Sequence, residues 1–171
     1  RGKKILKGFD DDVVENLMSN MKEKGVKFIT GEFPKEIRKK NNLFLENFKN
    51  LNTKKFHMVM EAVGREANVE KLNVKSAKIN LSKNSSIIVD DYFQTSNKNI
   101  YAIGDVIDRI QLTPVAIAEA MILVRNLKMK KKEKFNYNNV PTAVFSNPNF
   151  ACIGYTESEA NKKFKNIEVY R

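Results

Sequence analysis

Short apolar runs that end at a glycine alternate with amphipathic stretches along this chain. The clearest example lies in residues 95–127, where the apolar run from Ile100 to Ile103 stops at Gly104 and Asp105. A strand covered on both faces is continuously hydrophobic, so this run predicts a buried parallel strand. Ligands of open α/β sheets bind at the carboxyl ends of such strands, and this pattern places Asp105 there.

A long apolar segment after this turn predicts a helix over residues 114–127. Thr113 is a good N-cap, and Pro114 is a good first helical residue. The first N–H groups of the helix would be unpaired and would carry a partial positive charge toward the same crevice. The segment is apolar on most faces, with Glu119 among the exceptions, so we expect the helix to be largely buried. These features suit a flavin that carries a ribityl chain. The Asp105 carboxylate would accept hydrogen bonds from the ribityl hydroxyls, and the helix start would face the electron-rich edge of the flavin ring.

The rest of the chain predicts a mixture of helices and strands. Acidic residues at 10–12 and apolar residues at helical spacing predict a helix that ends at Gly25. Two alternating stretches with a polar turn between them predict an antiparallel pair over residues 34–48. Thr156 is a suitable cap for a further helix. The other apolar runs predict strands at residues 26–30, 56–63, 87–90, 142–145, 151–155 and 167–170.

Composition narrows the class of protein. The chain has 171 residues, of which 42% are hydrophobic and 30% charged, a globular composition that favours a cytoplasmic location. The net charge of 31 − 20 = +11 raises the question of nucleic acid, but the lysines are spread over predicted helices and loops without interleaved aromatic residues. We expect no nucleic-acid partner, although a basic non-catalytic binding module stays an alternative. No stretch approaches the length of a membrane-spanning helix, so we expect no membrane partner.

Thiol and metal chemistry have little support in the sequence. Cys152 is the single cysteine, so neither an intrachain disulfide nor a cysteine metal cluster can form. His57 is the single histidine, and a catalytic triad or a zinc site would need partners that the chain lacks. We therefore expect neither a catalytic residue nor a metal site.

Six short motifs occur in an order and at a spacing that resemble one family. They are residues 8–10 (GFD) after a basic stretch, 62–65 (AVGR), 100–105 (IYAIGD), 112–117 (LTPVAI), 140–146 (VPTAVFS) and 154–160 (GYTESEA). Together they resemble the FAD-dependent pyridine nucleotide–disulfide oxidoreductases, in the glutathione reductase branch. The LTPVAI motif favours glutathione, trypanothione and large thioredoxin reductases over dihydrolipoamide dehydrogenase. The chain departs from the family at residues 119–121, where Glu-Ala-Met replaces the usual small-Gly-Arg.

The resemblance implies an α/β fold in three parts. Residues 1–66 would be the C-terminal part of an NADPH-binding, Rossmann-like domain, and residues 67–138 the second segment of an FAD-binding domain. Residues 139–171 would start an α+β dimerisation domain. The parent enzyme would be a homodimer that transfers hydride from NADPH through FAD to glutathione disulfide. A large thioredoxin reductase or a trypanothione reductase-like enzyme is the alternative.

The resemblance also assigns flavin and nicotinamide contacts. Asp105 would accept hydrogen bonds from the ribityl chain of FAD, and Thr113 would meet the pyrimidine edge of the flavin. Gln111 and Ala143 would approach the nicotinamide of NADPH through their backbones.

Three further positions correspond to the NADPH site of the family. Arg1 matches the first of two arginines that grip the 2′-phosphate. Lys7 occupies the position of the second arginine. It keeps the positive charge but cannot form the two parallel hydrogen bonds that a guanidinium gives to a phosphate. Gly64 would line the site with its backbone.

The resemblance further implies that the chain is an internal or truncated fragment. In the family, the Gly-rich fingerprints and the redox CxxxxC pair precede the region that corresponds to residue 1, and the His–Glu pair follows residue 171. Disulfide exchange needs a thiolate with a resolving partner. We therefore expect the 171-residue chain alone to be inactive, to hold FAD or NADPH weakly, and to associate through exposed apolar faces.

Overall fold

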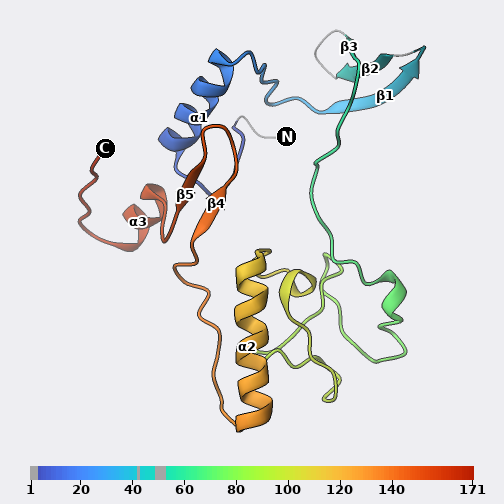
Figure 1. Cartoon of the computed structure of the whole chain (residues 1–171), viewed down its shortest axis with the longest axis vertical. Coiled ribbons are helices and arrows are strands. Elements are labelled where there is room, and N and C mark those ends of the chain that lie inside the picture. Colours follow the sequence, from blue (N-terminus) through green and yellow to red (C-terminus); the bar gives the residue numbers. More distant parts are fainter. Residues whose placement is uncertain (1–3, 42, 49–52) are drawn as a thin grey trace. The chain divides into compact units, whose positions relative to one another are not determined.

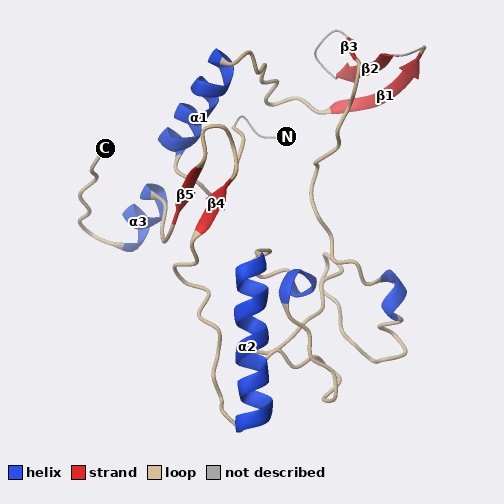
Figure 2. Ribbon diagram, in the orientation of Figure 1, coloured by secondary structure: helices blue, strands red, loops and turns tan. Residues whose placement is uncertain are grey.

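The computed structural model describes residues 4–41, 43–48 and 53–171, and its contacts divide the chain into two compact units. Unit 1 is Arg1–Ala62 together with Pro141–Arg171, and unit 2 is Val63–Val140. Helices and strands are mixed along the chain (Figures 1 and 2), as the predicted α/β class requires. The division into three domains stays a prediction.

Helix α1 (Asp11–Glu23) of unit 1 forms where the helical spacing predicts it. Val14 and Leu17 lie on one face and are buried, so the amphipathic pattern has its expected result. Acidic residues occupy the first turn, where they favour the helix dipole, and Gly25 follows the helix with a left-handed φ of 89°.

The described strands of unit 1 form two small antiparallel sheets. Strand β1 (Pro34–Lys40) pairs with β2 (Leu43–Phe48), which confirms the predicted antiparallel pair, and β2 also pairs with β3 (Lys54–Phe56). In the second sheet, β4 (Thr142–Val144) pairs with β5 (Phe150–Cys152).

Helix α3 (Glu157–Lys163) follows the second sheet and begins with a capping box. The Thr156 hydroxyl accepts a hydrogen bond from the Glu159 N–H at 3.2 Å, and the Glu159 carboxylate accepts one from the Thr156 N–H at 2.9 Å. This reciprocal pair confirms Thr156 as the cap.

Unit 2 is held together by one hydrophobic core. Phe93 is completely buried and packs with Val69, Ile87, Ala102 and Ile107. The backbone around this core has little regular structure. Its elements are the 3₁₀-helices η1 (Glu70–Leu72) and η2 (Gly104–Ile107), the helix α2 (Thr113–Met129) and three isolated antiparallel bridges.

The predicted parallel strand at residues 100–103 is wrong. Tyr101 forms an isolated antiparallel bridge with Gln94, and Ala102 is the only one of these four residues that is buried. A parallel strand needs neighbours on both sides. Among the described residues, the backbone partners of this run come from the segment just before it.

Three other predicted strands also lack regular pairing. Residues 26–30 and 167–170 are irregular in the structure, and of the strand predicted at residues 56–63 only Phe56, the last residue of β3, is paired. Met58, Met60 and Val63 are each more than four-fifths exposed. The apolar composition of such runs indicates that they suit a covered sheet, but strand formation depends on partners distant in sequence. The predicted strand at residues 87–90 is reduced to single bridges at Ile87 and Val89.

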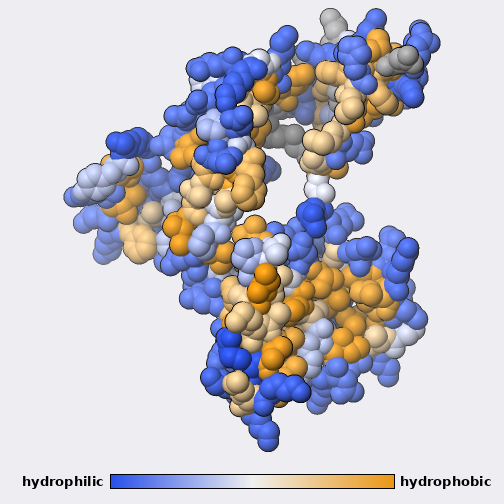
Figure 3. Space-filling model, viewed as in Figure 1, coloured by the Kyte–Doolittle hydropathy of each residue, from blue (hydrophilic) through white to orange (hydrophobic). Residues whose placement is uncertain are grey.

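The expectation of a largely buried helix at residues 114–127 is also wrong. Only Val115 and Glu119 of α2 are buried, whereas Ile117, Met121 and Val124 are each more than half exposed. Figure 3 shows hydrophobic side chains open on the visible surface of unit 2.

Candidate functional site

The segment from residue 104 to the start of α2 contains Asp105 and Thr113, the two predicted flavin residues. Gly104 opens η2 with a left-handed φ of 71° and is itself buried. A Cβ built on Gly104 would lie 3.1 Å from the Cβ of Ala116 in α2. Glycine is therefore required both by the backbone conformation and by the close approach of the helix.

Substituting Gly104 with alanine should destabilise unit 2 by about 1–3 kcal/mol, because a non-glycine residue at this φ is strained and its methyl group would press on Ala116. Urea unfolding followed by circular dichroism measures the loss. Gly64→Ala is the matched control, since its Cβ would meet open space, although its φ of 147° carries some strain. An alanine at residue 104 that left stability unchanged would contradict the tight approach.

Asp105 follows this turn, and its carboxylate remains accessible. Its side chain is 46% exposed, and its Oδ2 accepts one hydrogen bond from Nη2 of Arg65 at 3.1 Å. An exposed ion pair of this kind contributes only about 0–1 kcal/mol. The carboxylate can therefore accept hydrogen bonds from the hydroxyls of a ligand.

The start of α2 lies a few residues beyond Asp105. The cap residue is Leu112, so Thr113 is the first helical residue and the prediction of Thr113 as N-cap is wrong by one position. Thr113 is exposed, and no side chain caps the helix. Gln111 donates from its Nε2 to Oδ1 of Asp108 at 2.7 Å, which holds the loop between η2 and α2.

A buried carboxylate lies behind the turn. Glu119 of α2 is 1% exposed, and its Oε2 accepts a hydrogen bond from the Gly104 N–H at 2.6 Å. Its Oε1 accepts one from the Tyr137 hydroxyl at 2.6 Å, and that hydroxyl in turn accepts one from Nη1 of Arg109 at 3.2 Å. Nη2 of Arg109 also donates to two backbone carbonyls, those of Val89 and Asp90. Both carboxylate oxygens of Glu119 are thus satisfied, as a buried charge requires.

The hydroxyl of Tyr137 should titrate late. Burial, together with the hydrogen bond to the Glu119 carboxylate, raises the pKa of Tyr137 to about 12, against an opposing effect of Arg109. The pKa in the folded state lies above the ordinary value of 10.0, so this group's contribution to stability is complete below pH 10 and is lost as the pH rises toward 12. An absorbance titration of tyrosinate should show a component near pH 12 that Tyr137→Phe removes. Persistence of that component in the variant would contradict the assignment.

The remaining predicted residues are divided between the two units. Gly64 of unit 2 has a φ of 147° and is exposed beside Arg65. Lys7 and Ala143 belong to unit 1, where Lys7 is exposed in a turn and Ala143 pairs with Ala151 across the second sheet. Arg1 lies outside the described residues. Their roles toward NADPH stay predictions.

Four residues of this site do not stand out in the sequence as functional candidates. They are Arg65, Arg109, Glu119 and Tyr137. For Glu119 a signal is present, because a charged residue in the middle of an apolar helix needs buried partners or an exposed face. Arg65 ends the AVGR motif, but nothing in the sequence connects it with Asp105, and Arg109 and Tyr137 have no local signal because their partners are distant in sequence.

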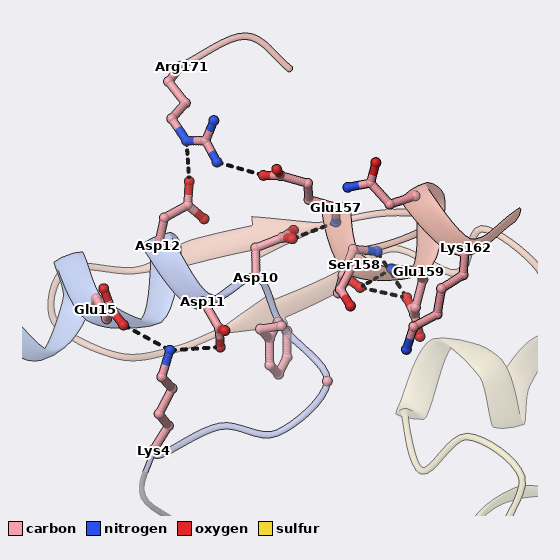
Figure 4. Close-up of a pocket in the computed structure, with 14 residues that line it drawn as sticks. Lys4, Asp10, Asp11, Asp12, Glu15, Glu157, Ser158, Glu159, Lys162 and Arg171 are labelled. Atoms are coloured by element: carbon pink, nitrogen blue, oxygen red, sulfur yellow. Dashed lines mark hydrogen bonds and ion pairs between the residues drawn. The ribbon is translucent and has the colours of Figure 1, made fainter. Parts of the chain in front are cut away.

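Unit 1 contains a different, acid-lined pocket of about 870 Å³ between the starts of α1 and α3. Figure 4 shows four of its carboxylates in ion pairs: Lys4 lies between Asp11 and Glu15, and Arg171 between Asp12 and Glu157. The Arg171 guanidinium lowers the pKa of Asp12. No group of acidic, histidine or cysteine residues in the described part of the chain is arranged to hold a metal ion. This pocket is a set of satisfied ion pairs.

Two further observations concern the residues that the structure describes. Cys152 is a free, exposed cysteine in β5. None of the described helices combines the length and apolarity needed to cross a membrane.

Comparison with known proteins shows what this chain resembles. Residues 1–120 match the pyridine nucleotide-disulphide oxidoreductase family. The chain is 37% identical to the chloroplastic/mitochondrial glutathione reductase of Pisum sativum over 171 residues, covering 99% of this chain and 31% of that protein. It is 36% identical over 174 residues to the trypanothione reductase of Trypanosoma congolense, covering 99% and 35%. The fold matches the flavoprotein disulfide reductase RclA from Escherichia coli with a TM-score of 0.88, at 24% identity, over 94% of this chain and 37% of that one.

The fold is therefore that of the FAD- and NAD(P)-binding disulfide reductases. This chain belongs to the pyridine nucleotide-disulphide oxidoreductase family, whose members use FAD and NADPH. It spans about a third of the length of the curated relatives it matches.

Proposed function

We propose that this chain forms part of a flavoprotein disulfide reductase that passes hydride from NADPH through FAD to glutathione disulfide. In this proposal the enzyme is a cytoplasmic homodimer, and the chain supplies half of the flavin site. The single observation that carries the proposal is the accessible Asp105 carboxylate on a tight glycine turn, in the segment that leads into the uncapped start of α2.

The residues present suit the ribityl and pyrimidine portions of FAD. The ribityl chain offers hydroxyl donors, and Asp105 offers an exposed carboxylate acceptor that is engaged in a weak surface ion pair with Arg65. The pyrimidine edge of the flavin is electron-rich, and the start of α2 at Thr113 presents unpaired N–H groups with a partial positive charge. When bound, FAD supplies the two-electron chemistry. The residues of this chain bind and orient it.

Glutathione disulfide is the preferred substrate in this proposal. The LTPVAI sequence at residues 112–117 and the similarity to glutathione reductases of a plant and a bacterium support that choice. The trypanothione reductase of Trypanosoma congolense is nearly as similar, at 36% identity against 37%. The disulfide form of trypanothione is therefore the second candidate substrate.

A comparison of flavins tests the proposed site in the 171-residue chain itself. Riboflavin and FAD carry the ribityl hydroxyls that Asp105 would bind, whereas lumiflavin has the same ring without them. We expect weak binding of FAD and riboflavin, measured by quenching of flavin fluorescence, with lumiflavin bound about tenfold less tightly or worse. Equal affinity for lumiflavin and riboflavin would mean that the ribityl chain is not recognised. No flavin binding at all would count against the flavin role of this segment.

A further inference from the structure

Glu119 occupies a position that ordinary helix packing does not explain. It is almost completely buried in a helix in which Val115 is the only buried apolar residue. Removing a carboxylate from water is costly unless hydrogen bonds replace the lost hydration. Here both oxygens are bonded at 2.6 Å, one to the Gly104 N–H and one to the Tyr137 hydroxyl. Short bonds to an ionised acceptor are among the strong ones in proteins.

Tyr137 connects Glu119 to Arg109. A guanidinium can only donate, so the Tyr137 hydroxyl accepts from Arg109, and it donates its own proton to the Glu119 carboxylate, which can only accept. Arg109 also holds the carbonyls of Val89 and Asp90. The network therefore anchors Glu119 to two other segments of unit 2, and its members polarise one another in the same sense.

The other end of the network is the turn that carries Asp105. The Gly104 N–H points into the protein and would lose its hydrogen bond if Glu119 were absent. Because Glu119 lies on α2, the same helix that begins at Thr113, this bond links the two predicted flavin contacts. It joins the Asp105 turn to the body of the helix whose start would meet the flavin ring.

We propose that Glu119 is a positioning residue for flavin binding: its buried carboxylate holds the Gly104–Asp105 turn in register with the start of α2. Glu119 does not touch the flavin and acts through the orientation of Asp105. This inference rests on the proposed function for its flavin part. Its structural part, the fixing of Gly104 by Glu119, can be tested without any flavin.

The test uses the 171-residue chain with Glu119→Leu, which removes both acceptors, and Glu119→Gln, which keeps one oxygen for the Gly104 N–H. Amide hydrogen exchange measured by NMR reports on the turn. The Ala102 amide, bonded to the Phe93 carbonyl at 3.0 Å, serves as the reference for the core. We expect Glu119→Leu to speed exchange at Gly104 about tenfold to a hundredfold relative to Ala102, and Glu119→Gln to stay within about threefold of the wild type.

Flavin affinity is the second readout on the same proteins. Glu119→Leu should weaken FAD binding about tenfold and leave lumiflavin binding unchanged, and Glu119→Gln should restore most of the FAD affinity. Faster exchange at Gly104 with unchanged FAD affinity would overturn the positioning role. Unchanged exchange at Gly104 in Glu119→Leu would overturn the inference whether or not flavin binds. Equal affinity of the wild type for lumiflavin and riboflavin would overturn only the proposed function.

Loss of the whole core in Glu119→Leu would show as rapid exchange at Ala102 as well. In that case Tyr137→Phe provides the test, because it removes one hydrogen-bond partner of the carboxylate and keeps the ring that packs edge-on against Phe135. We expect a rise in Gly104 exchange of a few-fold at constant Ala102 exchange. No change at Gly104 would contradict the network.

Discussion

Replacing Asp105 with alanine should lower the affinity of the chain for FAD about tenfold to a hundredfold. Hydrogen bonds to a charged group are worth about 1.5–3 kcal/mol, and the variant removes the carboxylate that would accept from the ribityl hydroxyls. The loss should be specific, because lumiflavin has no ribityl chain and should bind the variant as it binds the wild type. Fluorescence titration of both flavins gives the two affinities.

Asp91→Ala is the matched control for this experiment. Asp91 lies in the same unit and also carries an exposed carboxylate in an ion pair, with Lys134 at 2.5 Å. The control removes the same charge and a similar surface contact, so its FAD affinity should equal that of the wild type. Equal losses in Asp91→Ala and Asp105→Ala would indicate a general effect of charge, which would contradict a specific role for Asp105.

Replacing Phe93 with alanine should destabilise unit 2 by about 3–5 kcal/mol, the cost of deleting a buried aromatic side chain. Phe93 is completely buried at the centre of a small core. Its backbone φ of 67° lies in the left-handed region, and alanine at this position would keep the same backbone strain. The expected result is a lower midpoint of urea unfolding, or loss of folding in unit 2. The hydrogen-exchange rate of the Ala102 amide should rise as well, because this amide lies in the same core.

Met121→Ala is the control for the core. Met121 is more than half exposed on α2, and alanine is a good helix former, so the change should be within about 0.5 kcal/mol. If Phe93→Ala cost no more than this control, Phe93 could not be the centre of the core of unit 2.

Elements with local signals could be predicted from the sequence. The amphipathic helix at residues 11–23 and the antiparallel pair at residues 34–48 formed as predicted, although no side chain caps the start of the helix. The capping box of α3 forms between Thr156 and Glu159, which lie within four consecutive residues of the sequence. Each of these structures depends on side chains close in sequence, so the pattern contains nearly all the information needed.

Two of the predicted strands failed for the opposite reason. The runs at residues 56–63 and 100–103 are apolar enough for a covered sheet, but apolar composition does not supply the neighbouring strands. The expected burial of α2 failed likewise, because the surroundings of a helix determine which of its faces are covered.

The candidate site was only half predictable. In the sequence alone, a glycine and a carboxylate after an apolar run point to Asp105, and a Thr-Pro helix start points to Thr113. Glu119 stands out only as a polar exception, since its partners Gly104 and Tyr137 lie 15 and 18 residues away in the sequence. A single side chain gives no sign of which distant groups it will meet.

The most direct test of the central claim is an exchange of segments. The chain aligns over 171 residues with the glutathione reductase of Pisum sativum, so it can replace the corresponding segment of that enzyme. We predict that the chimera is purified with bound FAD and reduces glutathione disulfide with NADPH, and that Asp105→Ala in the chimera lowers its FAD content. A folded chimera that retains no FAD, or that retains it equally with Asp105→Ala, would contradict the account.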